Sequence, residues 1–196
     1  GFQARRTMKA AQELYEGVEI EGMGAVGLIT YMRTDSLRLS EDALKDAADY
    51  ILERWGKKYL PDTPRHFKTK KNAQDAHEAI RPTMPSLSPD QVKDSLSSDQ
   101  YKLYKLIWER FIACQMANCL QSTTQAEVSA KNYIFKASGY TVTFDGFTVL
   151  YEEKKDEDSE SGGALPPLEK DMPLRCKEIA GNQHFTQPPA RYTEAS

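Results

Sequence analysis

The hydrophobic pattern changes its period near residue 121, and this change most limits what the chain can fold into. Before it, apolar side chains recur every three or four residues, which is the period of an amphipathic helix. After it, Thr, Val, Tyr and Phe alternate with polar residues, as in strands with one covered face. The sequence therefore predicts an α+β fold, with a mainly helical domain over residues 1–120 and an antiparallel β-rich segment over residues 121–196.

Capping residues place the helices of the first part. One helix is expected over Ala4–Glu16, where a glycine follows, and another is expected between Ser40, an N-cap followed by two acids, and Gly56. The run Ser88-Pro89-Asp90-Gln91 has the residues of a capping box, with proline at the first helical position. A last helix is expected from about Asp99 to Met116.

The second part is expected to hold several short antiparallel strands. Alternating patterns occur around AEVSA, NYIFKAS, YTVTF and TVLY, and a further strand is expected over residues 174–179. Gly139 and the pair Asp145-Gly146 would supply turns between them.

The net charge of −3 is divided unevenly along the chain. Residues 1–120 carry 18 basic and 17 acidic side chains, whereas residues 121–196 carry 8 and 12, and the run at 152–160 accounts for the acidic excess. We expect that run to be a solvated loop. Because the rest is nearly neutral, binding of any polyanion would depend on local basic clusters such as Arg5-Arg6-Lys9 and Lys68-Lys70-Lys71.

Several function classes lack their sequence signals. No apolar run is long enough to span a membrane and no signal peptide opens the chain, which predicts a soluble, cytoplasmic protein. No GxGxxG or Walker pattern predicts a nucleotide site. Cys114 and Cys119 are spaced more widely than a CxxC knuckle, so reduced thiols are expected in preference to a zinc site.

The segment GLITYMRTDS, residues 27–36, sets three chemically active side chains at alternating positions. If the segment is a strand, Tyr31, Arg33 and Asp35 leave the same face and lie close together. A tyrosine oxygen can attack phosphorus, a guanidinium can bind phosphate oxygens, and a carboxylate can orient that guanidinium. The alternative from spacing alone is a surface ladder of cross-strand ion pairs without catalytic function.

Three motifs in the same order resemble those of one family. GLITYMRTDS, DAHEAIRPT at residues 75–83 and QPPARYTEAS at residues 187–196 are similar to motifs of the type IA DNA topoisomerases, in the bacterial topoisomerase I branch. The topoisomerase III branch more usually has proline where Met32 stands. The resemblance covers nearly the whole chain.

The resemblance implies an enzyme, an isomerase that relaxes negatively supercoiled DNA without ATP. Tyr31 would attack a DNA phosphate and remain joined to the 5′ end, while a second strand passes through the gap before religation. Arg33 would stabilise the charge of the transition state, with Asp35 as its orienting partner, and Thr34 and Ser36 would contact DNA.

The second motif adds His77, which resembles the family histidine that contacts the scissile phosphate or assists proton movement. Glu78 is a supporting residue beside it. On a helix ended by Pro82, His77 and Arg81 would share a face and both reach phosphates. Arg191, in the third motif, is a further predicted DNA contact.

The resemblance also implies that this chain is an internal fragment. Family members open with a domain whose glutamate and aspartates hold Mg²⁺, and nothing like its acidic signature occurs here. We therefore expect the nucleophile domain and part of the arch domain, with no metal bound by the chain itself. Its partners would be single-stranded DNA and the remaining domains of the same polypeptide, in the cytoplasm at the nucleoid.

Two alternatives remain open. The chain alone could be a single-stranded-DNA-binding and hinge module that is catalytically inert, because an active site between domains would be half built. A tyrosine recombinase also forms phosphotyrosine esters, but those enzymes place their arginines and histidines before a tyrosine near the C-terminus. Here Tyr31 precedes His77 and the other candidates.

Overall fold

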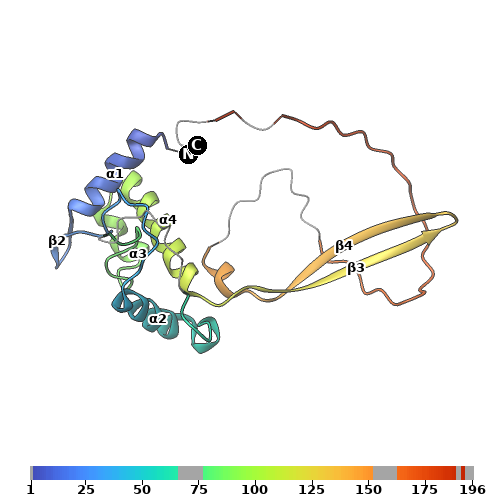
Figure 1. Cartoon of the computed structure of the whole chain (residues 1–196), viewed down its shortest axis with the longest axis horizontal. Helices are drawn as coiled ribbons and strands as arrows, with labels where there is room; N and C mark the ends of the chain where they lie inside the picture. Colours follow the sequence, from blue (N-terminus) through green and yellow to red (C-terminus); the bar gives the residue numbers. More distant parts are fainter. Residues whose placement is uncertain (1, 66–76, 152–162, 189–190, 193–196) are drawn as a thin grey trace. The chain divides into compact units, whose positions relative to one another are not determined.

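The structure is a computed structural model that describes residues 2–65, 77–151, 163–188 and 191–192. It divides into two compact units, Gly1–Leu120 with Phe144–Lys154 and Gln121–Thr143 with Lys155–Ser196. Helices form the first unit and two long strands the second (Figure 1), so the predicted α+β class is confirmed. The acidic run at 152–160 and the lysines of 68–71 lie outside the described residues.

The helices of the first unit follow the capping residues. They are α1 (Ala4–Glu16), α2 (Glu41–Trp55), α3 (Pro89–Val92) and α4 (Ser98–Gln115). The Ser40 hydroxyl accepts a hydrogen bond from the backbone N–H of Ala43, and capping boxes begin α3 and α4. The predicted first helix agrees with α1, and the predicted last helix differs from α4 by one residue at each end.

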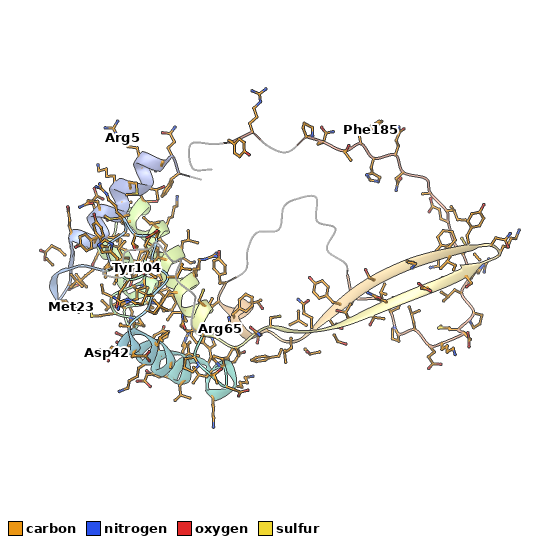
Figure 2. The ribbon with its side chains drawn as sticks, viewed as in Figure 1. Arg5, Met23, Asp42, Arg65, Tyr104 and Phe185 are labelled. Atoms are coloured by element: carbon orange, nitrogen blue, oxygen red, sulfur yellow. The ribbon has the colours of Figure 1, made fainter. Side chains whose placement is uncertain are left out.

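The core of the first unit lies where α1 and α2 pack against α4. Fully buried side chains include Leu14, Leu28, Ile29, Ile51, Tyr104, Ile112 and Met116. Tyr104 lies inside this unit (Figure 2), and its hydroxyl donates to the carbonyl oxygen of Leu87 at 2.6 Å. Burial raises the pKa of Tyr104. Because Leu28 and Ile29 belong to this core, the GLITYMRTDS segment is anchored in it.

A short hairpin leads from α1 to the GLITYMRTDS segment. Its strands are β1 (Val18–Ile20) and β2 (Gly24–Val26), which pair antiparallel with Glu19 opposite Ala25. Three short 3₁₀ helices also belong to this unit: η1 (Lys57–Tyr59), η2 (Lys93–Ser95) and η3 (Gly146–Val149).

The residues after β4 return to the helical unit, although the sequence interpretation placed them in the second domain. The Tyr59 hydroxyl donates to Asp145 Oδ1 at 2.8 Å, and the backbone N–H of Phe147 donates to the carbonyl of Ala117 at 3.0 Å. The predicted strand around TVLY is wrong, because η3 forms there and the N–H groups of Thr148, Leu150 and Tyr151 donate to the nearby carbonyls of Asp145 and Phe147.

The second unit holds one two-stranded sheet of β3 (Leu120–Ala130) and β4 (Tyr133–Phe144). The prediction of several short strands is wrong, because the patterns merge into two long strands and Gly139 lies inside β4. A Cβ on Gly139 would lie 2.3 Å from the carbonyl oxygen of Gly163, so glycine is needed for close approach rather than for a turn.

No strand forms over the expected residues 174–179. Within the described stretch 163–188, the chain forms neither a helix nor a strand. Leu174 and Ile179, at the ends of the expected strand, are exposed, and so is Phe185, which Figure 2 labels. An alternating pattern alone does not supply the pairing partner that a strand requires.

Candidate active site around Tyr31

The GLITYMRTDS segment, called the motif segment below, is not the strand that its pattern predicted. It has one isolated bridge, at Ile29, and bends at Met32 and Arg33. Burial still alternates after the bend, with Met32 and Ser36 buried and Arg33 and Asp35 exposed. The prediction of a regular strand is wrong because the pairing partner covers only the first half of the segment.

That partner is the stretch His77–Thr83, called the partner segment below. The N–H of Thr30 donates to the carbonyl of Arg81, and the N–H of Thr83 donates to that of Leu28, both at 3.0 Å. Between these bonds Ile29 lies opposite Pro82. At a non-hydrogen-bonded pair neither residue gives its N–H to the partner strand, so proline fits there without loss of a bond.

Two threonine side chains extend this pairing, and sequence reasoning missed both. Thr30 Oγ1 donates to the carbonyl of Ala79 at 2.7 Å and accepts from the N–H of Arg81 at 2.9 Å. Thr83 Oγ1 donates to the carbonyl of Gly27 at 2.7 Å. A threonine inside each of the first two motifs was the available signal, and its meaning depends on the pairing.

The pairing brings Tyr31 and His77 together. Their ring centroids are 5.6 Å apart with planes tilted by 49°. On another side the ring of Tyr15, from α1, meets Tyr31 edge-on with centroids 5.3 Å apart. Tyr31 is half-buried and packs against the core, so its ring direction is fixed by neighbours on both sides.

The start of the motif segment is also bound to α1. The N–H of Leu28 donates to the carbonyl of Leu14 at 2.8 Å. A Cβ on Gly27 would lie 2.8 Å from the backbone oxygen of Tyr15, so only glycine allows this approach without a shift. Helix α1 therefore sets the position at which the motif segment begins.

Arg33 and Asp35 are both exposed. Neither forms a hydrogen bond or ion pair with another residue in the ranges that the structure describes. The alternative, a ladder of cross-strand ion pairs, is therefore not supported, because Arg33 and Asp35 form no ion pair in those ranges. An arginine held near Tyr31 but without a carboxylate partner is available to an external anion.

Thr34 and Ser36 form local turns. The N–H of Ser36 donates to Thr34 Oγ1 at 3.0 Å, and the N–H of Arg38 donates to Ser36 Oγ at 3.2 Å. Ser36 is buried, with 5% of its surface exposed. These hydroxyls therefore shape the chain after Tyr31, and their role as DNA contacts stays a prediction.

The predicted helix at His77–Arg81 is wrong. These residues have no helical structure, because a residue before proline avoids the helical conformation and Arg81 pairs instead with Thr30. Arg81 Nη2 lies 2.7 Å from Glu78 Oε2, and Nη1 donates to the carbonyl of Pro82 at 3.0 Å. The half-buried Arg81 guanidinium thus holds the partner segment in shape.

Arg191 belongs to the second unit and is exposed. Its predicted DNA contact stays a prediction. The cysteines of the described residues are free, with Cys114 and Cys119 half-buried and Cys176 exposed. No helix in the described ranges is both long and apolar enough to cross a membrane.

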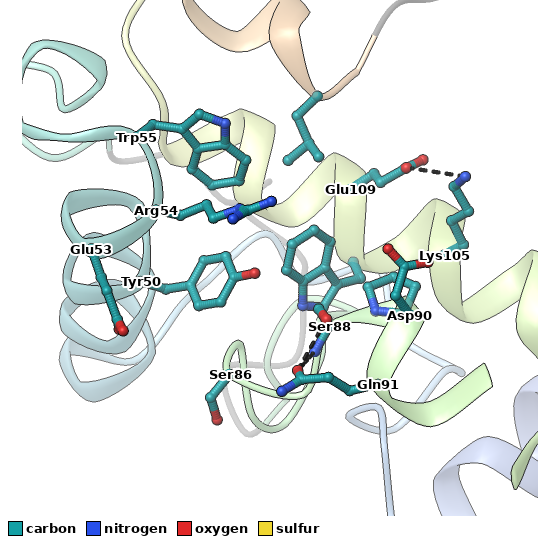
Figure 3. Close-up of a pocket in the computed structure, with 13 residues that line it drawn as sticks. Tyr50, Glu53, Arg54, Trp55, Ser86, Ser88, Asp90, Gln91, Lys105 and Glu109 are labelled. Atoms are coloured by element: carbon teal, nitrogen blue, oxygen red, sulfur yellow. Dashed lines mark hydrogen bonds and ion pairs between the residues drawn. The ribbon is translucent and has the colours of Figure 1, made fainter. Parts of the chain in front are cut away.

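A separate polar pocket of about 630 Å³ lies between α2, the loop before α3, and α4 (Figure 3). The Tyr50 ring meets that of Trp108 edge-on, with centroids 5.4 Å apart, and Lys105 faces Glu109 at 3.6 Å. Burial raises the pKa of Glu109 and also that of Tyr50. None of the predicted site residues is among the described residues that line this pocket.

Comparisons with known proteins agree with the motifs. A family model described as DNA topoisomerase matches residues 1–196. The chain is 52% identical to DNA topoisomerase 1 of Rickettsia felis and 50% identical to that of Rickettsia bellii, over 100% of this chain and 26% and 25% of those proteins. Full-length topoisomerase I from Thermotoga maritima matches with a TM-score of 0.71 at 37% identity, over 86% of this chain and 26% of that one.

The chain therefore belongs to the type IA DNA topoisomerases. Within them, its relatives are the bacterial enzymes named DNA topoisomerase 1, and the chain spans about a quarter of their length. The resemblance found in the three motifs is confirmed.

Proposed function

We propose that this chain supplies the nucleophile with which a type IA topoisomerase relaxes negatively supercoiled DNA. One strand would be cleaved, a second passed through the gap, and the first religated. The observation that carries the proposal is the paired motif and partner segments, which hold Tyr31 beside His77. Family membership supports the reaction class.

Tyr31 Oη would attack the phosphorus of a DNA phosphodiester. The bond from phosphorus to the 3′ oxygen breaks, the 5′ phosphate stays on the tyrosine, and the proton lost by the phenol is balanced by one gained at the 3′ oxygen. One ester replaces another, so religation is the reverse reaction and requires no ATP. Packing against Tyr15 and the core limits the directions that the hydroxyl can take.

Arg33 would bind the phosphate oxygens while charge builds in the transition state. Its exposure two residues after Tyr31, without an ion pair in the described ranges, supports this role. Asp35 is exposed on the same stretch and would orient the guanidinium once DNA is bound.

His77 would contact the scissile phosphate or move the proton. Its ring lies against that of Tyr31, which supports a role at the same phosphate. Arg81 and Glu78 support it by fixing the partner segment through their ion pair. Arg81 would meet DNA with only the exposed edge of its guanidinium, so its positioning role is the larger one.

Magnesium has no site among the described residues. No three His, Cys, Asp or Glu side chains in those ranges cluster as ligands of one ion, and the Glu78 carboxylate is already bound to Arg81. The family resemblance supports placing Mg²⁺ in other parts of the full-length protein, and no step above passes through it.

The proposed partners are single-stranded DNA and the remaining domains of the same polypeptide, in the cytoplasm. The chain alone would bind single strands weakly and cleave them negligibly, because the rest of the site is supplied by those domains. An inert binding and hinge module is therefore the behaviour proposed for the isolated chain.

The test is a chimaera in which this chain replaces the matching quarter of the Rickettsia felis enzyme, which is 52% identical. Covalent capture of a labelled single-stranded oligonucleotide is measured on a denaturing gel with Mg²⁺, together with relaxation of negatively supercoiled plasmid. We expect a 5′-linked adduct and relaxation without ATP.

Tyr31→Phe should abolish both signals. Tyr15→Phe is the matched control, because its ring touches Tyr31 but its hydroxyl has no assigned role, and it should keep the adduct. An adduct that persists in Tyr31→Phe, or one linked to the 3′ end, contradicts the proposal. DNA binding without any adduct in a folded chimaera leaves the inert module as the function.

A further inference from the structure

Residues 30–38, called the clasped loop below, are bound at both ends to one residue of the partner segment. Thr30 Oγ1 donates to the carbonyl of Ala79 at 2.7 Å, and the N–H of Ala79 donates to the carbonyl of Arg38 at 2.8 Å. The chain therefore leaves Ala79 at Thr30, passes through Tyr31, and returns to the same residue. Loops whose ends lie close together in this way are frequently functional.

Arg38 is the last residue of the clasped loop, and both of its backbone polar groups are bound. Its carbonyl accepts from Ala79, and its N–H donates to Ser36 Oγ at 3.2 Å. The Ser36 side chain is buried, and the next residue, Leu39, packs against the core. The fold thus fixes the main chain of Arg38 although its side chain is exposed.

The charged side chains of the clasped loop are not paired with one another. The loop carries Arg33, Asp35 and Arg38, so its net charge is positive. The Arg38 guanidinium forms no hydrogen bond or ion pair in the described ranges, as was found for Arg33 and Asp35. Two guanidinium groups on one fixed loop beside Tyr31 are therefore available to the same polyanion.

We propose that Arg38 binds a second phosphate of the DNA strand on which Tyr31 acts. The inference rests on the proposed function for the identity of that strand. Arg33 would hold the phosphate under attack, and Arg38 would hold a neighbouring phosphate from the other end of the clasped loop. Two contacts at fixed main-chain positions orient a strand, whereas the strand can turn about a single one. Arg38 is a binding residue and takes no part in bond breaking.

The test measures binding of the whole chain to fluorescein-labelled single-stranded oligonucleotides by anisotropy, over a series of salt concentrations. Each phosphate contact to a single strand contributes about 0.7 to the slope of log K against log salt concentration. Arg38→Gln should therefore reduce that slope by about 0.7 and weaken binding about fivefold at ~0.1 M salt. The loss should be equal for oligo(dT) and for a mixed sequence, because phosphate contacts carry no sequence information.

All variants in this test also carry Tyr31→Phe, so that only non-covalent binding is measured. A chimaera that forms no adduct would then contradict the proposed nucleophile, while a loss of binding in Arg38→Gln would still support the phosphate contact. The two proposals can therefore fail separately.

Arg54→Gln is the matched control. It removes the same charge from an exposed arginine on α2 that forms no hydrogen bond or ion pair in the described ranges, and it should leave the slope and the affinity unchanged. Arg38→Lys should keep most of the slope, because lysine keeps the charge. The melting temperature of Arg38→Gln should equal that of the parent chain, because the bonds to Ala79 and Ser36 use its main chain.

Four results would overturn the proposal. They are an unchanged slope in Arg38→Gln, an equal loss of slope in Arg54→Gln, a lowered melting temperature that accounts for the weaker binding of Arg38→Gln, and no detectable binding by the parent chain at low salt. A reduced slope in Arg38→Gln alone, restored by Arg38→Lys, supports it.

Discussion

The two units of the chain bury their side chains to very different degrees. The helical unit holds a core in which Leu14, Ile51 and Ile112 have no exposed surface. In the second unit, Gly139 is the one residue of β3 and β4 that is buried, and Tyr133, Ile134 and Phe135 are more than half exposed. The first unit is therefore stabilised by apolar burial, and the second mainly by strand pairing.

This difference explains where the proposed chemistry lies. Tyr31 and His77 are held by segments that end in the core, so their separation is fixed by packing. A two-stranded ribbon without a core of its own could not hold two side chains to such a tolerance. Tyr133, Ile134 and Phe135 of β4 are exposed instead.

The largest expected effect comes from deleting the same atoms in the two units. Ile112→Ala, at 0% exposure, should lower the free energy of unfolding of the helical unit by about 3 kcal/mol. Ile134→Ala, at 62% exposure, should change stability by less than about 1 kcal/mol. Urea unfolding of each variant measures this, and equal losses would show that β4 has a core.

The pairing of the two segments should show the next largest effect. Thr30→Val removes the bonds to Ala79 and Arg81 while keeping the shape, and should cost about 1–2 kcal/mol. Adduct formation in the chimaera should fall as Tyr31 and His77 separate. Thr7→Val is the control, because its hydroxyl bond to Gln3 is exposed and lies in α1. A full adduct yield in Thr30→Val would mean that the backbone hydrogen bonds alone hold Tyr31 and His77 in position.

A smaller and purely local effect is expected at Gly139. Gly139→Ala would place a methyl group against the Gly163 carbonyl, so the stretch 163–165 should leave β4 while the melting temperature of the helical unit stays unchanged. Hydroxyl-radical oxidation of Leu165, which is half-buried and lies 3.0 Å from a Cβ on Gly139, measures this. Ser138→Ala, the exposed neighbour in β4, should leave the oxidation of Leu165 unchanged, and unchanged oxidation in Gly139→Ala would contradict the close approach.

The smallest effect should come from a surface ion pair. Arg6 donates to both carboxylate oxygens of Asp99, at 2.5 and 2.6 Å, and holds the pKa of that carboxyl below its ordinary value. A lowered folded-state pKa contributes stability above the unfolded pKa of about 3.9, and that stability is lost as pH falls through the folded value.

The melting temperature of Asp99→Asn should therefore lie slightly below that of the wild type at pH 7, and the gap should close in acid. Salt should narrow the gap, because both groups are exposed. Arg6→Gln should give the same difference in melting temperature while keeping Asp99 in the first turn of α4. A difference that grows as the pH falls would contradict a lowered pKa of Asp99.

Local signals determined which elements could be predicted from the sequence. Glycine follows α1 and α2, and the N-cap Ser40 precedes α2, so capping residues gave those bounds closely, whereas the bounds of α4 came from the spacing of its apolar residues. The errors lie where pairing with a distant segment decides the structure. The motif segment has the pattern of a strand, but its backbone pairing with the partner segment ends at the bond from Thr30 to Arg81. The helix predicted at His77–Arg81 is incompatible with that same pairing.

The proposed site was predictable as a set of residues but not as a geometry. The first motif predicted Tyr31 and the second predicted His77, but their separation of 46 positions in the sequence does not show that their rings are in contact. The supporting roles of Thr30 and Pro82 depend on a non-hydrogen-bonded pair that exists only once the register is set. Register is a tertiary property, so one sequence did not reveal it.

Both tryptophans of the chain, Trp55 and Trp108, line the polar pocket between α2 and α4. Light absorbed at the red edge of the protein spectrum is therefore emitted from one place in the helical unit. Tryptophan fluorescence would therefore report the unfolding of the helical unit and would not report that of β3 and β4. The protein thus carries its own optical label on one unit, and an extrinsic dye on the ribbon would make the two unfolding events separable in one cuvette.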